Sequence, residues 1–114
     1  MITLQNIDSS MIANNLIPFE PTHPGSLIRD ELEERKMSQA KLAKQIGVSP
    51  SLLNEVINGK RSVNTELALL LEASLGIAAH IWLDLQADYN MQVVKSDSSF
   101  MSRLANVRKI AAVL

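Results

Sequence analysis

The spacing of apolar residues after Pro24 predicts a series of short helices. Pro24 suits the first turn of a helix that runs to about Lys36. Ser38 can cap a second helix, because a serine hydroxyl accepts a hydrogen bond from a free N–H at a helix start. Gly47 ends this helix, since glycine readily adopts the left-handed conformation of a C-terminal cap. The inner faces of the two helices are predicted to contain Leu27, Ile28, Leu32, Leu42, Ala43 and Ile46.

A third helix begins only a couple of residues after the second one ends. Ser49 supplies its cap and Pro50 its first position, and Asn58-Gly59 stops it. Its predicted inner face consists of Leu53, Val56 and Ile57. Two short helices joined by a glycine-containing turn are typical of a helix-turn-helix.

Three further helices are predicted downstream. Asn64 can cap a helix over 65–75 that Gly76 closes, and its nearly all-round apolar character predicts the central helix of the domain. A fifth helix has one apolar stripe, formed by Ala78, Ile81, Trp82, Leu85 and Tyr89. After the polar stretch 95–99, a terminal helix has a packing seam of Phe100, Leu104, Val107, Ala111 and Leu114. This seam suits either folding back on its own domain or dimerisation.

The chain before Pro24 has no single helical or strand pattern. Ile2 and Leu4 alternate as in a short strand, whereas the residues around Met11 have helical spacing, and Pro18, Pro21 and Pro24 then interrupt the chain. We therefore predict an all-α protein, a five-helix domain with two additions. Its parts are an N-terminal arm at 1–22, a helix-turn-helix domain at 23–94 and an extra C-terminal helix at 95–114.

The composition favours a small globular protein. With 114 residues the chain suits one domain, and its 46% apolar share is enough for a buried core. The absence of cysteine excludes disulfides, thiolate metal sites and a cysteine nucleophile. No signal peptide or membrane-length apolar run is present, so we expect a cytoplasmic protein without a membrane partner.

Charge is distributed unevenly along the chain. The net charge is −1, but residues 36–61 contain five basic residues and one acidic residue, a local charge of +4. Such a patch on a nearly neutral protein suits contact with phosphates on one face, although a solvated charged face gives the same pattern.

The predicted helix-turn-helix places this charge beside a polar surface. In this motif the second helix lies in the major groove while the first crosses the DNA backbone. Lys60 and Arg61 follow the second helix, where they can reach flanking phosphates, and Lys44 either contacts phosphate or is only solvated. Gln39 and the free N–H groups at the first helix start can also bind phosphate. The outward positions of the second helix, which can approach base edges, are Pro50, Ser51, Asn54, Glu55 and Asn58.

The residues of this region resemble a known family. The run from Ser38 to Ser49 looks like the helix-turn-helix of the phage-repressor (Xre/Cro) superfamily. Three blocks in order, 23–25, 54–61 and 81–89, narrow the resemblance to the HigA antitoxins, also called VapI-like proteins. The similarity covers about His23 to Val94.

The resemblance implies a function and a set of DNA contacts. It implies an antitoxin that neutralises a RelE-like HigB ribonuclease toxin, represses its own operon, and binds a palindromic operator as a homodimer. By position, Gln39 and Ser49 would contact phosphate, and Asn58 and Lys60 would lie near the DNA backbone. The base-facing positions would be Pro50, Ser51 and Glu55. Proline has no side-chain hydrogen bond to offer, so specificity would rest on its neighbours and on DNA shape.

Other functions have less support. With two histidines, no cysteine and no glycine-rich phosphate loop, we expect neither an enzyme nor a cofactor or metal site. We expect Trp82 and Tyr89 to pack in the core, His23 to help start the first helix, and His80 to lie at the surface. The alternative functions are a stand-alone Xre-type repressor without a toxin partner, and a protein-interaction domain that has lost DNA binding.

Overall fold

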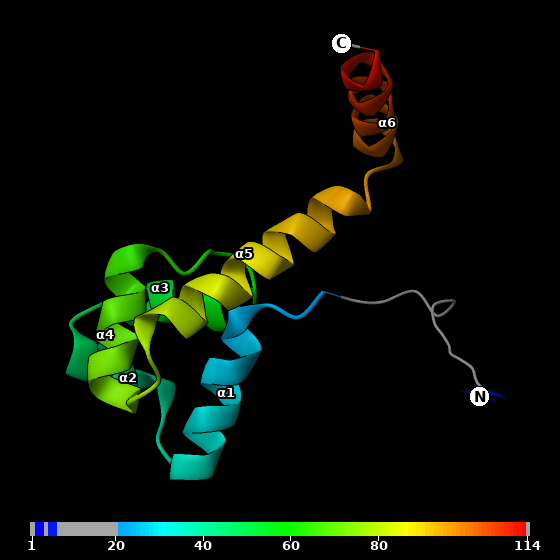
Figure 1. Ribbon diagram of the computed structural model, residues 1–114. Coiled ribbons are helices and arrows are strands. Elements are labelled where there is room, and N and C mark those ends of the chain that lie inside the picture. The colour runs from blue at the N-terminus through cyan, green and yellow to red at the C-terminus, as the bar shows by residue number, and fades with distance from the viewer. Residues whose placement is uncertain (1, 4, 7–20, 114) are drawn as a thin grey trace.

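Helices make up most of the described part of the protein. The computed structural model describes residues 2–3, 5–6 and 21–113, which contain six helices and two two-residue strands (Figure 1). The strands β1 (Ile2–Thr3) and β2 (Gln5–Asn6) pair in parallel. The helix predicted as possible around Met11 lies outside the described residues. The helices are α1 (Pro24–Arg35), α2 (Gln39–Ile46), α3 (Pro50–Ile57), α4 (Thr65–Leu75), α5 (Ala79–Lys95) and α6 (Ser98–Ala112). The all-α prediction with an extra C-terminal helix is confirmed.

The predicted capping residues begin and end these helices. Ser38 Oγ accepts a hydrogen bond from the Lys41 N–H and Ser49 Oγ accepts one from the Leu52 N–H, each at 3.1 Å. Asn64 caps α4 in the same way, through the Leu67 N–H at 2.9 Å. Gly47 and Gly76 adopt the left-handed conformation at the ends of α2 and α4, as predicted. The first helix ends at Arg35, one residue earlier than predicted, because Lys36 has a positive φ of 54°.

The core lies between α1, α2, α3, α4 and the first half of α5. Trp82 is fully buried, and its Nε1 donates to the Ile77 carbonyl at 3.0 Å. Gly25 allows α1 to approach α3 closely, since a Cβ at this position would collide with the backbone carbonyls of Val56 and Ile57. Arg35 joins α1 to α4 by donating to the Leu75 carbonyl at 2.6 Å. Every predicted inner residue of α2 and α3 is buried.

Two apolar residues that the sequence placed among the packing residues of α4 and α5 are exposed. Leu69 on α4 is 52% exposed, so this helix has a solvent-facing side despite its apolar sequence. Ile81 on α5 is 41% exposed, whereas the polar Gln86 is buried. Gln86 Oε1 accepts from the Val63 N–H at 2.8 Å and its Nε2 donates to Asn90 Oδ1 at 3.0 Å. Since both ends of this amide are hydrogen-bonded, its burial carries no unpaired polar atom.

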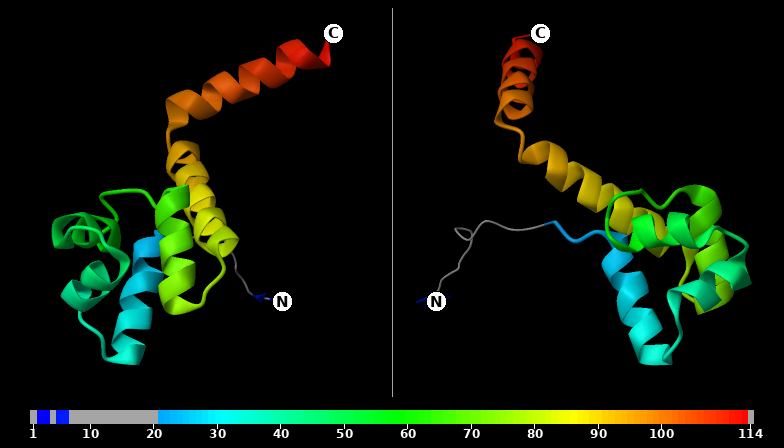
Figure 2. Two further views of the ribbon diagram at one scale, coloured as in Figure 1. Left: turned by 90° about the vertical axis from the view of Figure 1, so that its left-hand side faces the viewer. Right: turned by 180° about the vertical axis from the view of Figure 1, so that it is seen from behind.

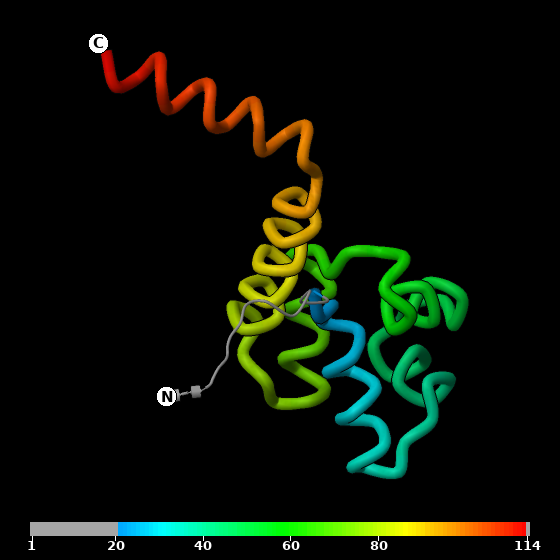
Figure 3. The backbone as a smooth tube through the Cα atoms, turned by 90° about the vertical axis from the view of Figure 1, so that its right-hand side faces the viewer, coloured from blue at the N-terminus to red at the C-terminus, as the bar shows by residue number. Residues whose placement is uncertain are grey.

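The terminal helix α6 projects from the far end of α5, away from the other helices (Figures 2 and 3). None of its residues is buried, and Val107 of the predicted seam is 59% exposed. Phe100 and Leu104 are half-buried near the junction with α5. Leu114, the last residue of the seam, lies outside the described residues. The fold-back alternative is therefore not the arrangement seen. No helix in the described part of the chain is long and apolar enough to cross a membrane.

Candidate nucleic-acid interface

The pair α2 and α3 forms the predicted helix-turn-helix. Leu53, Val56 and Ile57 anchor α3 in the core, so the opposite face of this helix is turned to solvent. Pro50, Ser51, Asn54 and Asn58 are exposed on that face and Glu55 is half-buried. The sequence therefore predicted correctly which side of α3 is available for contact.

A shallow hollow joins the start of α2 to the outer face of α3. It is lined by Gln39, Ala40, Pro50, Ser51, Asn54 and Glu55. Five of these six residues are predicted site residues, and they come from two helices that are separated in sequence by the turn. The first N–H groups of a helix have no carbonyl partner within it. In α2 the Lys41 N–H is capped by Ser38, and the N–H groups before it point out of the helix start. The hollow therefore combines polar side chains with a helix start that favours an anion.

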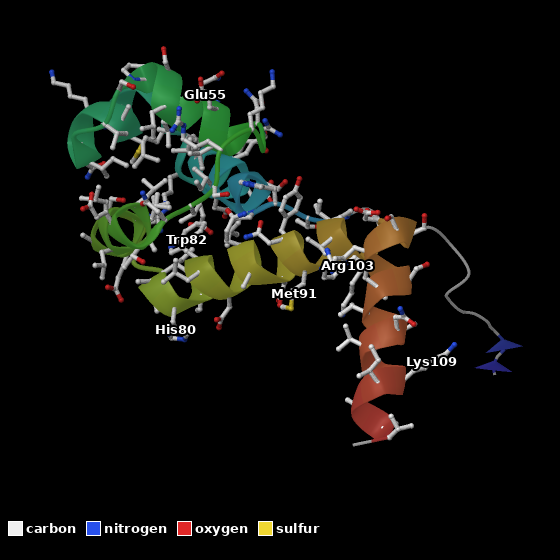
Figure 4. The ribbon with its side chains drawn as sticks, turned by 90° about the horizontal axis from the view of Figure 1, so that it is seen from above. Glu55, His80, Trp82, Met91, Arg103 and Lys109 are labelled. Carbon is white, nitrogen blue, oxygen red and sulfur yellow. The ribbon has the colours of Figure 1, made fainter. Side chains whose placement is uncertain are left out.

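Glu55 and Arg61 form an ion pair beside this hollow. Arg61 Nε donates to Glu55 Oε1 at 2.9 Å, and Arg61 Nη2 lies 2.8 Å from the same oxygen. Both side chains are about half exposed, at 45% for Glu55 and 53% for Arg61. The pair is worth little to stability at such exposure, but it offsets one positive charge near the predicted DNA face. Glu55 lies at the outer end of the molecule, far from α6 (Figure 4).

A row of hydrogen-bonded side chains crosses the same surface, and sequence reasoning missed its first member. Arg29 of α1 donates to Asn58 Oδ1 at 2.8 Å, and its Nη2 lies 3.5 Å from the Ile57 carbonyl oxygen. Asn58 Nδ2 donates to Asn54 Oδ1, and Asn54 Nδ2 donates to Gln39 Oε1, each at 3.1 Å. The only sequence signal for Arg29 was its place one helical turn after Gly25, where α1 approaches α3.

The other predicted residues lie around this surface with different surroundings. Ser49 is exposed and its Oγ caps α3. Lys60 is exposed just after α3, and its backbone N–H donates to the Glu55 carbonyl at 2.8 Å. Lys44 is exposed in the last turn of α2 and does not line the hollow. Within residues 21–113 the ion pairs are Arg35–Glu31 and Arg61–Glu55, so Lys44 and Lys60 have no acidic partner in that range.

His23 and Tyr89 serve the fold, whereas His80 lies at the surface. His23 Nδ1 accepts from the Gly25 N–H at 2.9 Å, which confirms its role at the start of α1. Its ring packs nearly perpendicular to that of Tyr89, with 4.8 Å between the ring centroids. Burial lowers the pKa of His23. His80 is exposed on the outer side of α5 (Figure 4). In the described part of the chain, no cluster of His, Cys, Asp or Glu could hold a metal ion.

The paired helices, their buried inner faces and the polar outer face of α3 define a helix-turn-helix protein. The helix-turn-helix family HTH_3 matches residues 28–82. Virulence-associated protein I of Dichelobacter nodosus is 36% identical over 76 residues, which cover 66% of this chain and 70% of that protein.

Two solved structures narrow the class further. The HigA-family antidote protein of Coxiella burnetii superposes with a TM-score of 0.67 at 30% identity, covering 75% of this chain and 95% of that one. The Pseudomonas aeruginosa antitoxin HigA, solved with the higBA promoter, gives 0.58 at 29% identity, covering 82% and 95%. The chain belongs to the HigA (VapI-like) antitoxin family of helix-turn-helix regulators, which confirms the resemblance found in the sequence.

Proposed function

We propose that this protein is the antitoxin of a toxin–antitoxin pair, and that it represses its own operon by binding a palindromic operator. The observation that carries the DNA part is the hollow between α2 and α3 with its polar outer row. In the hollow, Ser51, Asn54 and Glu55 can approach base edges and Gln39 a phosphate. Around it, Ser49, Asn58 and Lys60 contact further phosphates. Lys44 adds positive charge at the edge of this face, and Arg61 adds its charge there where DNA draws it away from Glu55. The Pseudomonas relative, solved with its promoter, supports the same use of the fold here.

The proposal includes a homodimer. One helix-turn-helix reads only a few base pairs, and two must be held about 34 Å apart to read both halves of a palindrome. Exposed apolar side chains on the second half of α5 and on α6 provide a surface for the second copy: Met91, Val93, Val94, Val107, Ile110 and Val113. In the single chain this surface is far from the hollow (Figure 4). A symmetric pair built on it leaves both recognition helices free.

Operator binding is tested by titrating the protein with its own promoter at several salt concentrations. Each phosphate contact contributes about 0.9 to the slope of log affinity against log salt. Lys60→Ala should reduce this slope and weaken all promoter variants alike, whereas Lys109→Ala, a lysine on α6, is the matched control (Figure 4). Salt-independent binding, or no binding to any part of the operon, would contradict the proposal.

The toxin part requires a separate experiment. Co-expression with the product of the adjacent gene should restore growth that the toxin alone arrests, and the two proteins should co-purify. The HigA-family relatives support this partner, a RelE-like HigB ribonuclease. If operator binding holds but no neighbouring gene encodes such a toxin, the protein is a stand-alone repressor of the same superfamily.

A further inference from the structure

The row Arg29–Asn58–Asn54–Gln39 has a fixed direction. A guanidinium can only donate hydrogen bonds, so Asn58 must turn its oxygen, not its amide nitrogen, toward Arg29. The amide nitrogen of Asn58 then donates to the oxygen of Asn54, and the amide nitrogen of Asn54 donates to the oxygen of Gln39. Arg29 therefore determines the orientation of all three side-chain amides, that is, which side of each carries the oxygen and which the nitrogen.

This direction determines what the row offers to DNA. All three carbonyl oxygens already accept a hydrogen bond from a neighbour in the row. The second N–H of each asparagine and both N–H groups of Gln39 Nε2 take no part in these hydrogen bonds. The surface is thus rich in donors. It suits phosphate oxygens at Gln39 and, at Asn54, base edges that present acceptors, such as guanine O6 and N7.

The same direction disfavours adenine. An asparagine reads adenine by donating to N7 while its oxygen accepts from the N6 amino group. In this row the oxygen of Asn54 already accepts from Asn58 Nδ2 at 3.1 Å, so an adenine N6 amino group would have to share that oxygen with Asn58. Reversing the amides would also turn the nitrogen of Asn58 toward the Arg29 cation, which pairs two donors. Only removal of Arg29 makes the reversed row acceptable.

We infer that Arg29 is a positioning residue of the DNA face, which orients Asn58, Asn54 and Gln39 as donors and so sets a preference for guanine over adenine at the base facing Asn54. This inference rests on the proposed DNA-binding function. Arg29 acts through the amides and does not itself need to touch the base.

Selection from a library of random 30-base-pair duplexes tests the inference. Arg29→Met removes the donor and the charge but keeps an unbranched apolar stem, and it should reduce the guanine-over-adenine ratio at one position per half-site by about tenfold. Arg29→Lys retains a group that can only donate and should keep most of the preference. Arg35→Met is the matched control, an arginine on the same helix that binds Leu75 and Glu31 instead.

The outcomes separate the possible roles of Arg29. If Arg29→Met weakens all sequences alike and lowers the salt slope by about 0.9, Arg29 is a phosphate contact and the inference is wrong. An unchanged base preference with a lower melting temperature would overturn it in favour of a purely structural role. Side-chain amide NMR signals of Asn54 and Gln39 should shift in Arg29→Met and stay near wild type in Arg29→Lys. If the wild-type protein selects no sequence at all, the proposed function itself fails.

Discussion

Helices α3 and α6 show how differently two amphipathic segments of one chain can be used. The eight-residue α3 buries three apolar side chains against α1, α2 and the core. The fifteen-residue α6 has regularly spaced apolar residues, yet it buries none of them. Periodicity therefore predicts that a segment is helical, whereas burial depends on whether another element of the same chain is within reach.

Helix α5 connects the two regions and changes character along its length. Its first half contributes the buried Trp82 and Gln86, while Met91, Val93 and Val94 near its end are exposed. Because the core ends partway along α5, the described part of the chain leaves most apolar side chains after that point exposed. Stability should thus reside before Asn90 and assembly after it.

The largest difference in the free energy of unfolding should come from equivalent side-chain truncations on α3 and on α6. Leu53→Ala removes a fully buried leucine and should lower the free energy of unfolding by about 2–5 kcal/mol. Ile110→Ala on α6, where the isoleucine is 58% exposed, should change it by less than about 0.5 kcal/mol. Urea unfolding, followed by Trp82 fluorescence at a concentration below dimer formation, measures both. Equal losses would show that α6 belongs to the core.

The contact between α1 and α3 should be nearly as sensitive. Gly25→Ala forces a methyl group against two backbone carbonyls of α3, one of them the Ile57 oxygen at 2.7 Å from the Cβ position, and should cost about 3 kcal/mol. Gly47→Ala has no atom within 4 Å but a φ of +75°, so it should cost about 1 kcal/mol from backbone strain alone. The same urea titration compares them. A smaller loss for Gly25→Ala than for Gly47→Ala would mean that the helices can separate easily.

Removing the region after Lys95 should separate assembly from folding. A chain that ends at Lys95 should keep the fluorescence of buried Trp82 but scatter light as a monomer, and operator affinity should fall by about 100-fold. Val107→Glu in the full-length chain should have the same effect without shortening the protein. A truncated protein that remains a dimer and still binds the operator would place the interface on α5 instead.

The smallest expected effect is a pH dependence from His23. Burial lowers the pKa of this histidine, so the unfolded chain binds a proton more readily than the folded one. Stability should therefore be fully present above pH 6.5, the ordinary pKa of histidine, and decrease as the pH falls toward the lowered value. His23→Asn, which retains a capping acceptor, should flatten this dependence, and His80→Asn at an exposed position should not. An identical pH profile for wild type and His23→Asn would contradict the assignment.

The sequence predicts which residues of the candidate site face outward but not which residues they contact. The cap of α3 and the spacing of its inner residues determine which residues face outward, so Pro50, Ser51, Asn54 and Asn58 could be named in advance. What these residues contact could not be named. Arg29 and Asn58 are 29 positions apart and Gln39 and Asn54 are 15 apart, so no local rule connects them.

Errors in the predicted core have a similar cause. Ile81 was expected inside because it is apolar. The helix is instead rotated so that Gln86 accepts a hydrogen bond from the Val63 N–H, which would otherwise have no partner. A buried backbone N–H without a partner costs about 1–3 kcal/mol, comparable to burying one more aliphatic side chain. This demand arises only when the loop before α4 packs against α5.

Helix limits, caps and the inner faces of α2 and α3 follow from the amino-acid order, because they depend on residues within one or two turns of each other. The membership of the HigA family was also readable there, since its blocks are short and local. The tertiary structure alone decided that Arg29 donates to Asn58, that Glu55 pairs with Arg61, and that α6 stands apart from the core. These features depend on the distances between separate helices, and such distances are set only when the core packs.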